Sequence, residues 1–203
     1  MHRLEVAGRT KAAFAELVYK GKAIQYAGEL EVHGDIPDIY RSMSVFFDLD
    51  RLWHQTEIIR TVVNIVLDVA KQLDRKSDFD TIASIVGNVG SFGPTPFSVQ
   101  LSLGLNKNLV VLSEIDFGNL GVFPLTIAQD DLFSNKRVLI LKDIIHHATS
   151  VQRAARLINR FGGQTVAFLT LVDKKPLKRR YNFDDLQDAW YSVLMEPENM
   201  GSE

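Results

Sequence analysis

The sequence contains no cysteine, and that absence excludes several kinds of site at once. Without thiols the chain cannot build a disulfide framework, a thiolate zinc site, a cysteine-ligated iron–sulfur cluster or a cysteine nucleophile. A run of about 18 apolar residues is also missing, and charged residues interrupt residues 1–10, so we expect neither a membrane-spanning helix nor a signal peptide. These absences favour a cytoplasmic protein.

Charge of one sign is not in excess either. Lys and Arg number 23, and Asp and Glu number 25, for a formal net charge of −2. A dedicated nucleic-acid-binding protein usually carries a strong basic excess, so this class of protein is not favoured. The 203 residues are 46% hydrophobic and 24% charged, which is typical of a single globular domain.

Apolar runs and helical patterns alternate through the middle of the chain. The apolar runs lie at residues 79–86, 109–112, 137–141 and 165–172, and helical spacing is found at 97–105 and 149–161. Strands that are apolar throughout are typical of a parallel sheet, because both of its faces are covered. We therefore predict an α/β core at 51–173, a mostly parallel sheet with helices on both faces.

Smaller additions flank this core within the single domain, at residues 1–50 and 174–203. We predict a helix at 10–19, a weak hairpin at 24–32, a helix at 50–73 and, after a basic loop, a docking helix at 183–195. The helix at 50–73 is apolar on several sides. That pattern predicts cover on both faces, either by the protein's own sheet or by a second subunit.

The most informative stretch is residues 138–150, Val-Leu-Ile-Leu-Lys-Asp-Ile-Ile-His-His-Ala-Thr-Ser. This order indicates an apolar strand, an acidic residue at its carboxyl end, a tight loop and the start of a helix. Ligands of open α/β sheets bind outside the carboxyl ends of the strands, and a helix start offers free N–H groups to phosphate. Thr149 and Ser150 add hydroxyl donors, and Asp143 can accept hydrogen bonds from a ribose diol. We predict a site for a phosphorylated ribose or a nucleotide.

The same stretch resembles the signature of the type I phosphoribosyltransferases, and most closely that of the orotate phosphoribosyltransferases. That signature has four apolar residues, two acidic residues, two apolar residues and a Thr-Thr-Gly-Thr-Ser-like loop. Laid on this chain without a gap, it makes Asp143 the second acidic residue and places the loop at His146, His147, Ala148, Thr149 and Ser150. The resemblance extends over most of residues 40–173 and implies a phosphoribosyltransferase-like fold.

The resemblance also implies an activity, a cofactor and an assembly. The family's chemistry is displacement of pyrophosphate from phosphoribosyl pyrophosphate by a nitrogen base, helped by Mg²⁺, and its members are commonly homodimers. A pyrophosphate loop is expected after the run at 79–86. Its candidates are Asn88, Val89, Gly90 and Ser91.

Several positions depart from the family's motif. The departures are Lys142 for the first acidic residue, His146 and His147 for two hydroxyl residues, Ala148 for a glycine, and Ser113-Glu114-Ile115-Asp116 where orotate enzymes carry an Arg-Lys pair. They make the phosphoribosyl pyrophosphate motif degenerate. Two functions therefore stay open, a divergent transferase and a catalytically inactive nucleotide sensor or protein-interaction module.

Structural explanations stay open for the same residues. Thr149 and Ser150 could act only as helix caps. His146 and His147 are adjacent and point in different directions, so a shared metal ion is not favoured and surface positions explain them as well. The basic run that starts at Lys174 could contact an acidic partner or simply face solvent.

Overall fold

A six-stranded parallel sheet organises the protein. The structure is a computed structural model, and it describes residues 1–26, 45–86, 94–113, 115–117, 120–122, 131–145, 149–174, 186 and 188–196. The strands are β1 (His2–Arg3), β4 (Thr81–Val86), β5 (Asn108–Ser113), β8 (Arg137–Ile145), β9 (Gln164–Asp173) and β10 (Trp190–Met195). Their order is β1-β10-β9-β8-β4-β5, with every neighbouring pair parallel. This confirms the predicted sheet and its four core strands.

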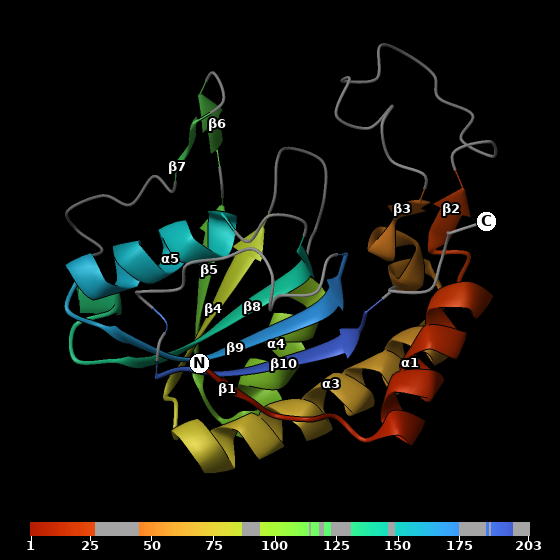
Figure 1. Ribbon diagram of the computed structural model, residues 1–203, viewed down its shortest axis with the longest axis horizontal. Coiled ribbons are helices and arrows are strands. Elements are labelled where there is room, and N and C mark those ends of the chain that lie inside the picture. Colours follow the sequence, from red (N-terminus) through yellow and green to blue (C-terminus); the bar gives the residue numbers. More distant parts are fainter. Residues whose placement is uncertain are drawn as a thin grey trace.

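Helices cover both faces of the sheet (Figure 1). On one face lie α1 (Gly8–Lys20), α3 (Thr56–Ser77) and α4 (Thr95–Leu105), and on the other lies α5 (Thr149–Arg160). Each face has its own apolar core. Leu139 and Leu141 of β8 join the core with α1, α3 and α4, whereas Ile140 joins the core with α5. Successive strand residues point to opposite faces, so an uninterrupted apolar run supplies both cores.

The long helix expected at residues 50–73 begins later than predicted. Leu49–His54 form a 3₁₀ helix, η1, and α3 runs from Thr56 to Ser77. The buried residues of α3 are Ile58, Val62, Val66, Val69, Ala70, Leu73 and Ser77. Three apolar residues beside this stripe, Val63, Ile65 and Leu67, are partly buried against the same core, because α1 and α4 flank α3. The extra apolar surface of this helix therefore does not require a second subunit.

The helix expected at residues 183–195 is wrong. Trp190–Met195 form β10, which pairs with β9 on one side and with β1 on the other. The five residues from Tyr191 onward in this strand are all buried. Consecutive burial is what a strand inside a covered sheet requires, and pairing with two neighbours outweighs the helical spacing of the apolar residues.

The strands β1 and β10, from the first and last parts of the described chain, lie side by side in the sheet. The Arg3 guanidinium in β1 donates two hydrogen bonds to the Glu196 carboxylate, at 2.8 and 2.7 Å. Lys11 of α1 forms an ion pair with the same carboxylate at 3.5 Å. β1 and β10 are therefore strands of the main sheet.

Two short antiparallel pairs lie outside the main sheet, β2 (Ile24–Tyr26) with β3 (Val45–Phe47) and β6 (Ile115–Phe117) with β7 (Leu120–Val122). The hairpin expected at 24–32 has only its first strand in the described part of the chain. That strand pairs with β3, and residues 27–44 lie outside the described residues. Among the helices that the structure describes, none is long and apolar enough to cross a membrane.

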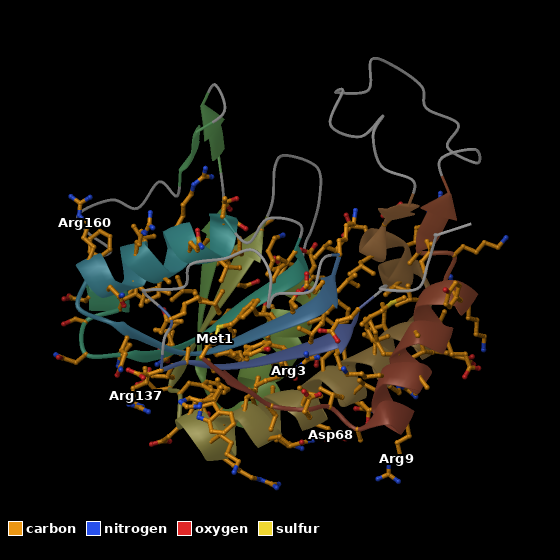
Figure 2. All side chains as sticks on the ribbon, in the orientation of Figure 1. Met1, Arg3, Arg9, Asp68, Arg137 and Arg160 are labelled. Atoms are coloured by element: carbon orange, nitrogen blue, oxygen red, sulfur yellow. The ribbon has the colours of Figure 1, made fainter. Side chains whose placement is uncertain are left out.

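The amino edge of the sheet is joined to the end of α3 by Arg137, the first residue of β8. Its guanidinium donates to the main-chain oxygen of Ser77 at 2.6 Å and to that of Asp78 at 2.9 Å. The last carbonyl groups of a helix have no partner within the helix and form the negative end of its dipole. Arg137 therefore satisfies the end of α3 with a cation, and Figure 2 shows it at that edge of the sheet.

We expect Arg137→Ala to lower the free energy of unfolding by about 1–3 kcal/mol, because two hydrogen bonds from a charged group to α3 are lost. Urea denaturation followed by circular dichroism measures this value. Arg160→Ala is the matched control, since Arg160 lies exposed in the last turn of α5 (Figure 2). Its loss should cost about 0.5 kcal/mol or less. Equal effects of the two changes would contradict the role given to Arg137.

Candidate functional site

The predicted site lies at the carboxyl edge of the sheet. β8 continues to Ile145, beyond the run expected at 137–141, and stays paired with β9 up to Asp173. α5 begins at Thr149, directly after the short connection that follows β8. The strand, the acidic residue and the helix start therefore follow one another as the sequence indicates.

Three of the predicted site residues fall in the described part of the chain. Asp143 is buried in β8, and Thr149 and Ser150 are the first two residues of α5. The other predicted site residues, His146, His147, Ala148, Asn88, Val89, Gly90 and Ser91, lie outside the described residues. Of the two carboxylates that depart from the family's motif, Glu114 also lies outside them, and Asp116 lies in β6. The two candidate loops follow β8 and β4, which are neighbours in the sheet. Both loops therefore start from the same part of the carboxyl edge.

Asp143 is held in place by its neighbours. Its Oδ1 accepts a hydrogen bond from the main-chain N–H of Ile144 at 2.7 Å and another from Lys142 Nζ at 2.5 Å. Its main-chain oxygen accepts from Thr170 Oγ1 of β9 at 3.3 Å. Among the residues that the structure describes, nothing donates to Oδ2. The carboxylate is therefore oriented through Oδ1, and Oδ2 is the oxygen left for a ligand.

The ion pair between Lys142 and Asp143 is a feature that sequence reasoning missed. Successive strand residues point to opposite faces, so spacing alone predicts that these two side chains diverge. The flexible lysine side chain instead returns to its neighbour, and the two side chains are only 12% and 11% exposed. Little water screens the pair, so the attraction exceeds that of a surface ion pair, and either charge alone would be costly to bury.

Two further charged residues end the neighbouring strand. Asp173 is the last residue of β9 and is buried, and Lys174 follows it. The main-chain N–H of Lys174 donates to the oxygen of Ile145 at 2.9 Å, which ties the two strand ends together. Burial lowers the pKa of the Lys174 ammonium below its usual value. Asp173 could have been found by the same signal as Asp143, an acidic residue at the end of an apolar run.

The described residues do not provide a magnesium site at Asp143. Mg²⁺ prefers an octahedral set of oxygen ligands. In the described part of the chain, no group of three or more His, Cys, Asp or Glu residues is placed to hold a metal ion. The Lys142 ammonium already lies on Oδ1 of Asp143, and it would repel a second cation at this carboxylate. A Mg²⁺ ion held by the protein therefore does not fit this carboxylate.

Related sequences among known proteins are phosphoribosyltransferases, although no family model matches the chain. An adenine phosphoribosyltransferase of Nostoc punctiforme is 25% identical over 159 residues, which cover 75% of this chain and 91% of that protein. An orotate phosphoribosyltransferase of Sulfurisphaera tokodaii is 30% identical over 130 residues, which cover 64% of this chain and 60% of that protein.

Solved structures show the same fold. The adenine phosphoribosyltransferase of Trypanosoma brucei, in complex with AMP, pyrophosphate and ribose-5-phosphate, matches with a TM-score of 0.64 at 16% identity, over 99% of this chain and 85% of that one. The orotate phosphoribosyltransferase of Mycobacterium tuberculosis, in complex with inorganic phosphate, matches with a TM-score of 0.57 at 16% identity, over 93% and 96%. The chain is similar in sequence to adenine and orotate phosphoribosyltransferases, and it has the fold of the type I phosphoribosyltransferases.

In the resemblance described above, Asp143 stands at the position of the family's second acidic residue and Lys142 at that of the first. The relatives include both adenine and orotate enzymes, so the resemblance is not to orotate enzymes alone. The structure explains how the substitution is accommodated in the strand. Lys142 neutralises the carboxylate that remains, where two adjacent carboxylates would need other partners.

We expect the pair to show strong coupling in a double-mutant cycle. Asp143→Asn should lower the free energy of unfolding by about 2–4 kcal/mol, because the enclosed Lys142 ammonium loses its counter-charge. The double change Lys142→Met with Asp143→Asn should cost less than the sum of the single changes, by about 1 kcal/mol or more. Urea denaturation measures all three variants.

Asp68→Asn is the control for the loss of a carboxylate, since Asp68 lies exposed on α3 (Figure 2). It should change the free energy of unfolding by about 0.5 kcal/mol or less. Additive effects at Lys142 and Asp143 would show that the two side chains do not interact in solution.

Proposed function

We propose that the protein is an active phosphoribosyltransferase that transfers the phosphoribosyl group of phosphoribosyl pyrophosphate to a nitrogen base. The observation that carries the proposal is the placement of Asp143 at the carboxyl end of β8, directly before the start of α5. The sequence relatives support the same chemistry, because those named above are adenine and orotate phosphoribosyltransferases. They give no support to an inactive sensor.

In this proposal, the described residues bind the sugar and its phosphate. Oδ2 of Asp143 accepts a hydrogen bond from a ribose hydroxyl. The free N–H groups at the start of α5, with the hydroxyl groups of Thr149 and Ser150, bind the phosphate of the ribose. We propose that His146, His147 and Ala148, which join β8 to α5 in the sequence, contribute to binding this phosphate.

The reaction itself breaks one bond and forms another at the same ribose carbon. A nitrogen of the base attacks the anomeric carbon, and the bond from that carbon to the pyrophosphate oxygen breaks, with both electrons leaving on pyrophosphate. The nitrogen gives up its proton, which pyrophosphate or water accepts. We propose that Asn88, Val89, Gly90 and Ser91 bind the pyrophosphate, since their loop follows β4 beside β8. Magnesium enters this scheme as part of the substrate, bound to pyrophosphate.

We propose adenine or orotate as the base, after the enzymes that the chain resembles. Release of pyrophosphate from phosphoribosyl pyrophosphate, in the presence of each base in turn, is the direct test. Turnover with one of them is expected. If neither base releases pyrophosphate and no phosphorylated ribose binds in calorimetry, the proposed function is wrong.

Asp143→Asn should weaken binding of ribose 5-phosphate by about tenfold or more, because a hydrogen bond to a charged group contributes about 1.5–3 kcal/mol. The same variant should bind inorganic phosphate as the parent protein does, since phosphate uses the start of α5. Calorimetry measures both ligands, and retained phosphate binding shows that the variant is folded. Equal loss of both ligands would contradict the division of roles between Asp143 and α5.

We also propose a two-fold homodimer, with α4 at its centre. α4 contains no charged residue, yet it exposes Leu103 to 72% and Val99 to 40%, beside Val111 of the edge strand β5 at 43%. A two-fold axis places one patch against its own copy, where any charge would meet the same charge. An uncharged apolar patch therefore suits a second copy of this chain.

Light scattering should report a dimer for the parent protein and a monomer for Leu103→Lys, because the substitution places two like charges at the interface. Tyr19→Lys is the control, since Tyr19 is an exposed apolar residue on α1. It should leave the dimer intact. A monomeric parent protein at high micromolar concentration would overturn this proposal.

A further inference from the structure

The contact between Lys142 and Asp143 stabilises the strand, and it also determines what kind of ligand Asp143 can bind. Lys142 Nζ and the main-chain N–H of Ile144 both donate to Oδ1 of Asp143, so this oxygen is already occupied. The negative charge of the carboxylate is matched by the ammonium group next to it. Oδ2 can still accept a hydrogen bond, but the charge of the carboxylate is already neutralised by the Lys142 ammonium.

Such an acceptor suits a neutral donor better than a metal ion. A hydroxyl group needs only a lone pair in the right direction, and Oδ2 offers one. A divalent cation on Oδ2 would lie within a few ångströms of the Lys142 ammonium, in a place where the two side chains are only 12% and 11% exposed. Poor screening by water makes that repulsion large.

The contact of Lys142 with Oδ1 of Asp143 also follows from the position of the two residues in the chain. Lys142 is adjacent in β8, and the strand is paired with β9 on both sides of this position, Lys142 with Thr170 and Ile144 with Val172. The main chain of Lys142 therefore stays next to Asp143, within reach of its carboxylate, whatever ligand is present. A metal ion can be removed from a protein by a chelator, whereas a lysine side chain cannot.

We propose that Lys142 acts as a built-in cation for Asp143, so that ribose hydroxyl groups bind at this carboxylate without a metal ion held by the protein. Lys142 is a positioning residue in this scheme, because it acts on the ligand through Asp143. The inference rests on the proposed function, since it concerns the same sugar site. The inference concerns only magnesium held by the protein, and it leaves unchanged the magnesium that pyrophosphate carries in the proposed function.

Calorimetric titration with ribose 5-phosphate tests the proposal, because this ligand carries ribose hydroxyl groups but no pyrophosphate. The parent protein should bind it equally in magnesium chloride and in EDTA. In Lys142→Glu, which places a second carboxylate beside Asp143, binding should be weaker in EDTA and should be restored by magnesium by about tenfold or more. Lys142→Met should show a smaller dependence in the same direction.

Lys107→Glu is the matched control. Lys107 also forms an enclosed ion pair, with Asp74 at 3.0 Å, but it lies beside the first residue of β5, at the amino edge of the sheet. This variant should bind ribose 5-phosphate without a magnesium effect. Circular dichroism on each variant shows whether it is folded before it is titrated.

The outcomes separate this inference from the proposed function. Metal-independent binding by the parent protein together with metal-dependent binding by Lys142→Glu supports the built-in cation. Binding by the parent protein only with magnesium overturns it, and so does metal-independent binding by a folded Lys142→Glu, while both leave a phosphoribosyl site in place. If neither ribose 5-phosphate nor phosphoribosyl pyrophosphate binds to any folded variant, the proposed function itself fails.

Discussion

The parallel pairing of β8 between β4 and β9 is the constraint on which the rest of the structure depends. Parallel strands all end at the same edge of a sheet, so the residues that follow apolar runs far apart in the sequence are brought together there. Pairing in register with β9 also determines which face each side chain of β8 takes. A shift by one residue would exchange the faces of Leu139 and Ile140 and move Asp143 out of the site.

The end of β8 shows how an apolar strand can carry charge. Leu141 and the residues before it serve two cores, and the next two residues are Lys142 and Asp143. A lone charge so near to these cores would lose most of its hydration. Pairing the two charges within one strand removes that difficulty without help from another element. The substitution of lysine in an acidic signature therefore changes the charge of the sheet edge while keeping the strand stable.

Much of this fold is predictable from the sequence, because its signals are local. Strands such as Thr81–Val86 and Gln164–Asp173 are apolar on both faces, and α5 has one apolar side and a glycine pair at its end, where Gly162 adopts φ of 77°. β10 was missed because its neighbours β9 and β1 are distant in the sequence. Apolar residues spaced for a helix do not reveal that two strands will pair with them.

The site is less predictable than the fold for a related reason. The sequence indicates Asp143 and the start of α5, since both are positions in a pattern. The direction of a long side chain is not part of that pattern, so the contact of Lys142 with Asp143 needed the structure. Sequence spacing also suggested a second subunit over α3, where the structure places α1 and α4 of the same chain.

In the proposed function, the charges at this edge of the sheet match the parts of a phosphorylated sugar. A phosphate at the start of α5 is stabilised by free N–H groups and by the helix dipole, but a nearby unpaired carboxylate would repel it. With Lys142 on Asp143, the carboxylate keeps one accepting oxygen and loses most of that repulsion. In the proposed site, one part is then free to bind an anion while the other accepts hydrogen bonds from neutral hydroxyl groups. A single ion pair within β8 thus allows an anionic phosphate and neutral hydroxyl groups to bind a few residues apart.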